Sequence, residues 1–145
     1  MTEIKIGNRT IPLMFTTYEM IAIQRDIGCT AAELREKVFG LKEIDDDPDN
    51  VRITVAEDPE KLNKLGMLIR ILGNAGLEEA GQEPDLTDKW VLRKMRPALV
   101  TGYAIMAMQE IVDGMTMESP ALAEADNGPV DEVLEAQKAK KEPGN

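Results

Sequence analysis

The start of the chain constrains the fold most, because its pattern predicts a β-hairpin over about residues 2–15. Two short apolar segments flank the pair Gly7-Asn8, and both residue types tolerate the positive φ angles of tight hairpin turns. Pro12 cannot donate a ladder hydrogen bond, so its strand is expected at a sheet edge or beside a bulge.

A helix is predicted directly after the hairpin, over about residues 17–27, and Gly28 ends it. Either Thr16 or Thr17 can cap its first turn. A hairpin that leads straight into a helix, and that contains no catalytic residue, indicates a small structural or interaction domain. The apolar residues that recur with helical spacing in this helix are Tyr18, Ile21 and Ile27.

Four further helices are predicted, and their boundaries have physical signals. Thr30 and Glu33 have the spacing of a capping box. Asp58-Pro59 places an acidic residue and a proline at the start of a long helix. Pro97 must separate the last two helices, because a proline breaks or kinks a helix interior. The predicted ranges are 31–39, 58 to between 77 and 80, 88–95, and 98–113.

The segments between these helices are less regular. Residues 45–50 are expected to form an acidic loop, and the alternation in 51–55 fits either a short strand or an extended arm. Residues 73–76 (Gly-Asn-Ala-Gly) are interpreted as the end of a helix, and 81–86 as a linker. After about residue 119 the composition shifts to Ala, Glu, Asp, Gly and Pro, which predicts a disordered tail.

These elements predict an α+β fold that is mainly α. An N-terminal β-hairpin is expected to pack on a bundle of about four to five helices, followed by a disordered acidic C-terminal tail. The length of 145 residues corresponds to about one domain, which we place at 1–118, with a flexible tail at 119–145. Only 3% of the residues are aromatic, so Leu, Ile, Val and the nine methionines must fill the core.

The helix predicted over 98–113 has more apolar surface than one-sided packing requires. At 100° per residue one stripe contains Val100, Ala104, Ala107 and Ile111, and a second stripe lies beside it. Together they span roughly 200°, whereas one-sided packing needs roughly 100°. Either the helix is central and buried on most sides, or one stripe faces another molecule. The second stripe consists of Ile105, Met108, Val112 and Met115, and Tyr103 completes the apolar arc.

The helix that begins near Pro59 has a similar excess of apolar residues. Met67 and Ile71 fall on the side of this helix that is otherwise polar. An exposed Met and Ile on a polar face indicate a contact site, although scattered exposed apolar residues are common. The predicted partner-binding residues are therefore Met67, Ile71, Tyr103, Ile105, Met108, Val112 and Met115.

We recognise no catalytic, cofactor-binding or metal-binding site and expect no enzyme. The absence of histidine removes the usual general base and the commonest metal ligand. The single cysteine, Cys29, excludes an internal disulfide and is expected to be a small apolar filler. Asp45, Asp47 and Asp49 match the first three ligand spacings of a calcium loop. Asn50 then stands where that loop needs glycine, so a solvated loop is expected.

The formal net charge of −10, from 17 basic and 27 acidic residues, disfavours binding to nucleic acid and to anionic membranes. Arg93, Lys94 and Arg96 form a small basic cluster, for which local salt bridges are the expected role. No apolar run approaches the roughly 18 residues of a membrane-spanning helix, and charged residues interrupt any N-terminal signal peptide. We therefore expect a soluble protein of a reducing cytoplasm.

With these elements placed, four segments resemble the tail assembly chaperones of long-tailed bacteriophages and related prophages. Residues 4–15 (IKIGNRTIPLMF) are similar to the opening hairpin of the family, and 16–28 to the helix that follows it. Residues 65–76 (LGMLIRILGNAG) resemble its middle helix. Residues 90–115 resemble its last helix, which starts at a proline and ends in Gly-Met. The likeness covers about 3–117 and consists of apolar spacing and turn residues.

The resemblance implies a function and its partners. Proteins of this family are made in the host cytoplasm and are absent from the mature virion. They bind the long helical tape measure protein, keep it soluble and help to recruit tail tube subunits. The expected partners are thus the tape measure protein and the tail tube protein, with no nucleic acid and no membrane. Self-association, such as a ring or spiral around the client, is a further expectation from the wide apolar arc.

Two other classes of protein remain open. An acidic regulator or inhibitor that imitates DNA would need carboxylates in two regular rows, whereas the acidic residues here are scattered, with one loop cluster. A virion tail structural protein, such as a terminator or connector, would need more β structure than one hairpin.

Overall fold

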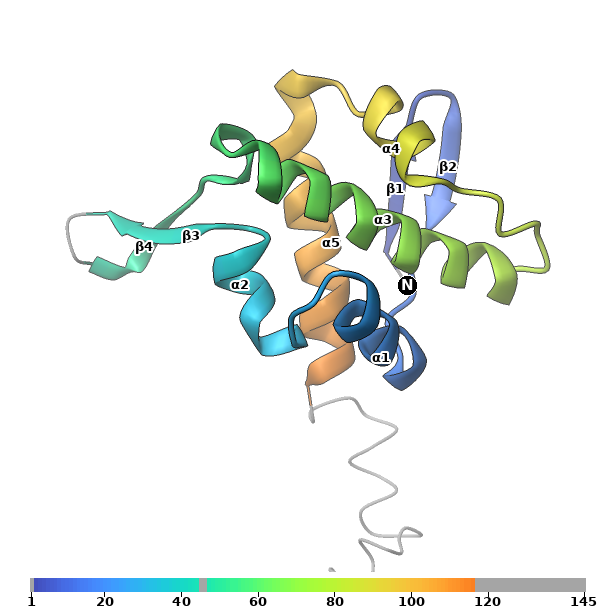
Figure 1. Cartoon of the computed structure of the whole chain (residues 1–145), viewed down its shortest axis with the longest axis horizontal. Helices are drawn as coiled ribbons and strands as arrows, with labels where there is room; N and C mark the ends of the chain where they lie inside the picture. The colour runs from blue at the N-terminus through green and yellow to red at the C-terminus, as the bar shows by residue number, and fades with distance from the viewer. Residues whose placement is uncertain (1, 45–46, 117–145) are drawn as a thin grey trace, which may run out of the picture. The chain divides into compact units, whose positions relative to one another are not determined.

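The computed structural model describes residues 2–44 and 47–116, and this part of the chain is mainly helical (Figure 1). The predicted α+β class is confirmed, with an N-terminal hairpin, five α-helices and a second hairpin within the described residues. The chain divides into two units, Met1–Gly114 and Met115–Asn145, and the tail predicted for 119–145 lies outside the described residues. The elements are β1 (Glu3–Ile6), β2 (Arg9–Pro12), α1 (Thr17–Asp26), α2 (Leu34–Lys37), β3 (Leu41–Ile44), β4 (Asp47–Ile53), α3 (Pro59–Glu79), α4 (Asp88–Lys94) and α5 (Val100–Met115), with 3₁₀ turns at Ala31–Glu33, Val55–Glu57 and Pro97–Leu99.

The N-terminal hairpin forms as predicted. β1 and β2 pair antiparallel, with Ile4 opposite Ile11. Gly7 turns the chain at a φ of 60°, where other residues would be strained. The isoleucines on the inner face of the hairpin are buried. The chain that continues β2 reaches α3, because the Met14 amide donates a hydrogen bond to the Leu72 carbonyl at 3.1 Å.

The first helix, α1, begins where the sequence predicts, with Thr16 as its cap. The Glu19 carboxylate accepts a hydrogen bond from the Thr16 backbone N–H at 2.9 Å, and the Thr16 side chain completes the capping box. Two of the three apolar residues that recur with helical spacing lie outside the core. Tyr18 and Ile21 are 74% and 56% exposed, whereas Ile23 is fully buried in the core.

The segment after α1 is less helical than predicted. Thr30 and Glu33 form the predicted capping box, but the helix expected over 31–39 is a 3₁₀ turn followed by the four-residue α2. Gly40, with a φ of 62°, then turns the chain toward β3. The Thr54 hydroxyl donates a hydrogen bond to the Gly40 carbonyl at 2.7 Å, which closes the base of the second hairpin.

The second hairpin, β3–β4, corrects the interpretation of the acidic loop. β4 covers Asp47–Ile53, so the part of that loop from Asp47 onward lies in a strand. The strands pair antiparallel with Leu41 opposite Ile53, and the register shifts next to Ile44. Of the two alternatives for 51–55, a short strand is correct as far as Ile53. This strand exists because it pairs with residues 41–44, for which the sequence pattern predicted no strand.

The long helix α3 contacts α1, α4, β2 and the turn at Val55–Glu57. Asp58 caps it, since its carboxylate accepts the Glu60 N–H at 2.9 Å. The helix continues to Glu79, which confirms the end predicted between residues 77 and 80. Gly76 is buried where α3 meets the backbone of Pro12. Glycine here permits close packing and does not end the helix.

The last two described helices follow the prediction closely. Thr87 caps α4, as its hydroxyl accepts the Trp90 N–H at 3.1 Å. Pro97 starts a 3₁₀ turn that leads into α5. In Figure 1 α5 (orange) runs behind α3 (green) and crosses it in this view. The core combines the hairpin isoleucines, the leucines of α3 and one side of α5.

Candidate functional site

One of the two apolar stripes predicted for α5 is exposed. Ile105 is 48% and Val112 is 58% exposed, and Met108 between them is half-buried. We call these three residues the α5 stripe. They are separated by three and then four positions, so they lie along one side of the helix over about two turns. The stripe is an apolar surface that a partner can reach.

The opposite side of α5 anchors the helix. The first predicted stripe is buried in the core, as expected. Gly114 packs against Phe15 so closely that a Cβ atom there would lie 2.7 Å from the ring carbon Cδ2. The buried carboxylate of Glu110 accepts the Thr2 backbone N–H at 3.0 Å. The α5 stripe therefore stands on a fixed helix and not on a loop.

The other predicted contact residues have different environments. Ile71 and Tyr103 are only 7% and 8% exposed, so the expectation that a partner can reach them was wrong. Ile71 is covered because α1 packs against α3, and Tyr103 lies among the core residues. Met67 is half-buried and packs against the core. Met115, the last residue of α5, is 51% exposed and continues the spacing of the stripe.

Exposed apolar residues on α1 were missed as candidate contacts. Tyr18 and Ile21 are three positions apart and are among the most exposed large apolar side chains of the described residues. The start of α1 lies beside the end of α5, because Phe15 contacts Gly114. The sequence signal that could have revealed them is the apolar residue Ile23 on the same helix. Ile23 is buried in the core, and Tyr18 and Ile21 are left exposed.

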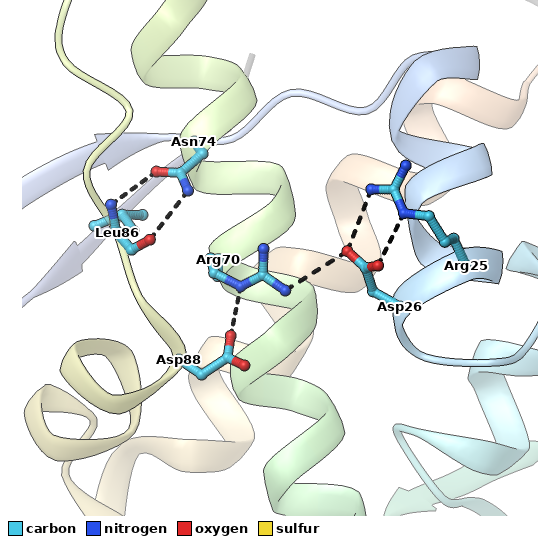
Figure 2. Close-up of polar contacts among 6 residues, drawn as sticks. All are labelled: Arg25, Asp26, Arg70, Asn74, Leu86 and Asp88. Atoms are coloured by element: carbon cyan, nitrogen blue, oxygen red, sulfur yellow. Dashed lines mark hydrogen bonds and ion pairs between the residues drawn. The ribbon is translucent and has the colours of Figure 1, made fainter.

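Arg70 of α3 joins α1 to α4 through a chain of charged groups (Figure 2). Its Nε donates a hydrogen bond to the Asp88 carboxylate, and its Nη2 lies 3.8 Å from the carboxylate of Asp26. Arg25 donates from its Nε to Asp26 at 2.9 Å. Two guanidinium groups thus balance two carboxylates. This balanced network positions helices and offers no free acid or base for catalysis.

The hydrogen bond from Arg25 lowers the pKa of Asp26 below its ordinary value, although partial burial acts in the opposite direction. Since the folded-state pKa is lowered, the ionised carboxylate favours the folded state. This contribution is present above the unfolded-state pKa of roughly 3.9. It is lost as the pH falls through the lower pKa of the folded state.

We therefore expect Asp26→Asn to destabilise the protein at pH 6 by no more than about 1 kcal/mol, as for most exposed ion pairs. The difference in unfolding free energy from the unmodified protein should shrink toward pH 2. Urea unfolding at several pH values measures it. As a control, the same substitution in an Arg25→Gln background should give a weaker pH dependence. An equal pH dependence in both backgrounds would show that Arg25 is not the cause.

The basic cluster at the end of α4 is not neutralised, contrary to the prediction. Arg93, Lys94 and Arg96 are exposed, and none of them has an ion pair with another residue that the structure describes. The acidic residue on α4, Asp88, pairs with Arg70 of α3.

The described residues offer little material for chemistry. Cys29 is buried, and burial raises the pKa of its thiol, which disfavours the reactive thiolate. Among residues 2–44 and 47–116, no three His, Cys, Asp or Glu side chains are placed to hold a metal ion, and Asp45 of the acidic loop lies outside these ranges. None of the described helices combines the length and apolar content that crossing a membrane requires.

The chain matches no family model, no curated protein and no solved structure. The α5 stripe is the predicted contact surface that stays accessible, because Ile71 and Tyr103 are buried. It is apolar, accessible to solvent and carried by an anchored helix.

Proposed function

We propose that this protein is a tail assembly chaperone of a long-tailed bacteriophage or prophage. In this role it binds the tape measure protein in the host cytoplasm, keeps it soluble, aids assembly of the tail tube and is absent from the mature virion. The α5 stripe is the observation that carries the proposal, because apolar residues stay exposed on a helix whose other side is packed. An amphipathic client helix can lay its own apolar side along such a surface.

The spacing of the α5 stripe suits a helical client. Ile105, Met108 and Val112 stand at relative positions 0, 3 and 7, which are the a, d and next a positions of a heptad repeat. A client helix with apolar residues at heptad spacing can interlock its side chains with these. Met108 adds an adaptable contact, because the unbranched thioether side chain fills irregular gaps.

The charge of the chain supports the same role. A net charge of −10 keeps a complex soluble while an apolar surface is being covered. Asp113, next to Val112, is exposed and has no ion pair with another described residue. A chaperone needs this combination, since its client would otherwise aggregate through its exposed apolar stripes.

The direct test is co-expression with a candidate tape measure protein. We expect the client to move from the insoluble to the soluble fraction and to co-purify with the chain. Mass spectrometry of purified phage particles should detect the client and not the chain. A chain that stays in the particles would identify a structural component, and competition with DNA for a partner would identify an inhibitor of the DNA-mimic type.

The double substitution Ile105→Asp/Val112→Asp should weaken client binding at least tenfold. Each change removes apolar contact area, worth on the order of 1 kcal/mol, and places a charge in the interface. Pull-down and the yield of soluble client measure the effect, and circular dichroism should show unchanged helicity. The matched control Gln24→Asp/Asn63→Asp adds the same charge at two exposed polar positions and should bind as the unmodified chain does.

Self-association through the same stripe is the competing use of this surface. Light scattering of both double variants measures it. If Ile105→Asp/Val112→Asp abolished an oligomer but left the client equally soluble, the stripe would be a contact between copies of this chain. The assignment of the α5 stripe to the client would then be wrong.

A further inference from the structure

A second surface, separate from the α5 stripe, is an apolar groove beside the end of α4. It has a volume of about 180 Å³ and is lined by Ala56, Leu62, Leu92, Met95, Pro97 and Val100. Ligand sites for small molecules usually hold roughly 300–1,000 Å³, so this groove suits one or two inserted side chains. We call it the α4 groove.

Solvent reaches apolar atoms at the rim of the α4 groove. Ala56 is exposed and Leu62 and Leu92 are half-buried. Leu99, which stands between two lining residues in the chain, is 50% exposed. A partner that covers this region therefore removes apolar area from water, which favours binding.

The cations that adjoin lining residues of the α4 groove in the sequence have no partners among the described residues. Arg93 and Arg96 alternate in the chain with the lining residues, and both are exposed without an ion pair or side-chain hydrogen bond to another described residue. Lys89 and Lys94, on the same helix, are in the same state. The stem of Lys94 rests on the hairpin turn at Gly7, with Cδ 3.4 Å from the position of a Cβ there.

The two acidic residues that directly follow Ala56 in the chain are already paired. Glu57 follows Ala56 and binds the guanidinium of Arg52 at 2.7 Å. Asp58 caps α3 and lies 3.3 Å from the Lys61 ammonium. The unpaired charged residues that adjoin the lining residues in sequence are therefore all positive, on a chain whose net charge is −10. Complementarity calls for a partner with negative charge next to an apolar group.

We infer that the α4 groove binds an acidic polypeptide segment whose leucine or methionine side chain enters the groove while its carboxylates meet Arg93 and Arg96. The apolar lining decides between a polypeptide and a nucleic acid, because an aliphatic side chain fills such a groove and a phosphate backbone does not. The overall negative field opposes a nucleic acid further. This inference does not depend on the proposed function, since it uses another surface.

The test measures fluorescence anisotropy of a labelled peptide, Asp-Glu-Leu-Glu-Glu-Leu-Glu-Asp, titrated with the full chain. We expect saturable binding that weakens as sodium chloride rises, because salt screens exposed charges. A second peptide with Asn and Gln in place of the acids, and a third with Ser in place of the leucines, should each bind at least tenfold more weakly. The two controls separate the contribution of charge from that of the groove.

Two variants locate the site. Arg93→Glu/Arg96→Glu should weaken binding about tenfold or more, because like charges would then face each other. The control Arg35→Glu/Lys42→Glu changes the net charge equally at exposed positions that also lack ion pairs with described residues, and it should bind within about twofold of the unmodified chain.

A third variant tests the groove itself. Ala56→Leu places a larger apolar side chain at the exposed edge of the groove and leaves the charge unchanged. Because this side chain occupies space in the groove, the variant should bind the leucine peptide more weakly and the serine peptide equally well. Equal binding of all three peptides, or equal loss in both arginine and control variants, would overturn the inference. So would oligo(dT) that binds with the same dependence on Arg93 and Arg96 and displaces the peptide.

Discussion

Replacing Gly76 with alanine is expected to destabilise the protein by about 3 kcal/mol, although alanine favours helices more than glycine does. A Cβ atom at this position would overlap the carbonyl group of Pro12 and lie 3.1 Å from the Leu13 nitrogen. These are backbone atoms, so no side chain can rotate away. α3 and the chain that continues β2 would have to separate, which would also strain the hydrogen bond from Met14 to Leu72.

Gly102→Ala is the matched control for this prediction. Gly102 is an exposed glycine inside α5, and no described atom beyond its immediate surroundings lies within 4 Å of a Cβ there. Alanine should therefore stabilise the protein by about 0.5–1 kcal/mol through helix propensity alone. Urea unfolding followed by the fluorescence of Trp90, the single tryptophan, measures both variants. Equal stabilisation by both would show that α3 does not approach Pro12 this closely.

Asn74→Ala should cost about 2 kcal/mol, because one side chain of α3 satisfies both backbone groups of Leu86 (Figure 2). The Asn74 amide nitrogen donates to the Leu86 carbonyl at 3.1 Å, and its oxygen accepts the Leu86 N–H at 2.9 Å. Leu86 is 5% exposed, so water replaces these bonds poorly. A buried group left without a partner costs roughly 1–3 kcal/mol.

Two substitutions sharpen this second prediction. Asn74→Asp keeps the size and the acceptor but loses the donor, so it should be about as destabilising as Asn74→Ala at neutral pH. Asn63→Ala removes an exposed asparagine of the same helix that bonds to no described residue, and it should change stability by less than about 0.5 kcal/mol. Chemical denaturation compares the three. If Asn74→Ala were as mild as Asn63→Ala, the linker would not depend on this pair of hydrogen bonds.

The features predicted correctly from sequence are those that neighbouring residues decide. Thr16 caps its helix through atoms two or three residues away, and the turn at Gly7 depends on backbone freedom at one position. Pro97 separates α4 from α5 because its ring removes the backbone N–H and prevents a continuous helix. Each of these signals depends on only a few consecutive residues, so a sequence pattern is sufficient to predict it.

The features that were missed depend on partners distant in sequence. β4 includes acidic residues with low strand propensity and exists because β3 pairs with it. Asn74 reads as a helix-end residue beside two glycines, yet its partner is Leu86 in the linker. The glycines of α3 mark close contacts: a Cβ on Gly66 would meet the Leu92 side chain at 2.6 Å, and one on Gly73 would meet Leu86 at 2.6 Å.

The candidate site shows the same division. The excess of apolar residues on α5 was visible in the sequence, but two explanations fitted it equally, a central helix or a contact surface. Ile71 illustrates why the sequence could not choose between exposed and buried sides. It lies on a helix side that reads as polar, and it is nevertheless covered because α1 packs against α3.

By itself the sequence determined where most elements begin and end, that the chain starts with a hairpin, and that α5 has more apolar surface than one neighbour needs. Only the tertiary structure decided that Ile105 and Val112 are exposed while Tyr103 is buried. It also decided that Arg93 and Arg96 form no ion pair with another described residue. The physical reason is that helix periodicity and capping act within a few residues. Burial and charge pairing depend instead on which segments distant in sequence pack against a surface, and residue spacing along one helix does not determine that packing.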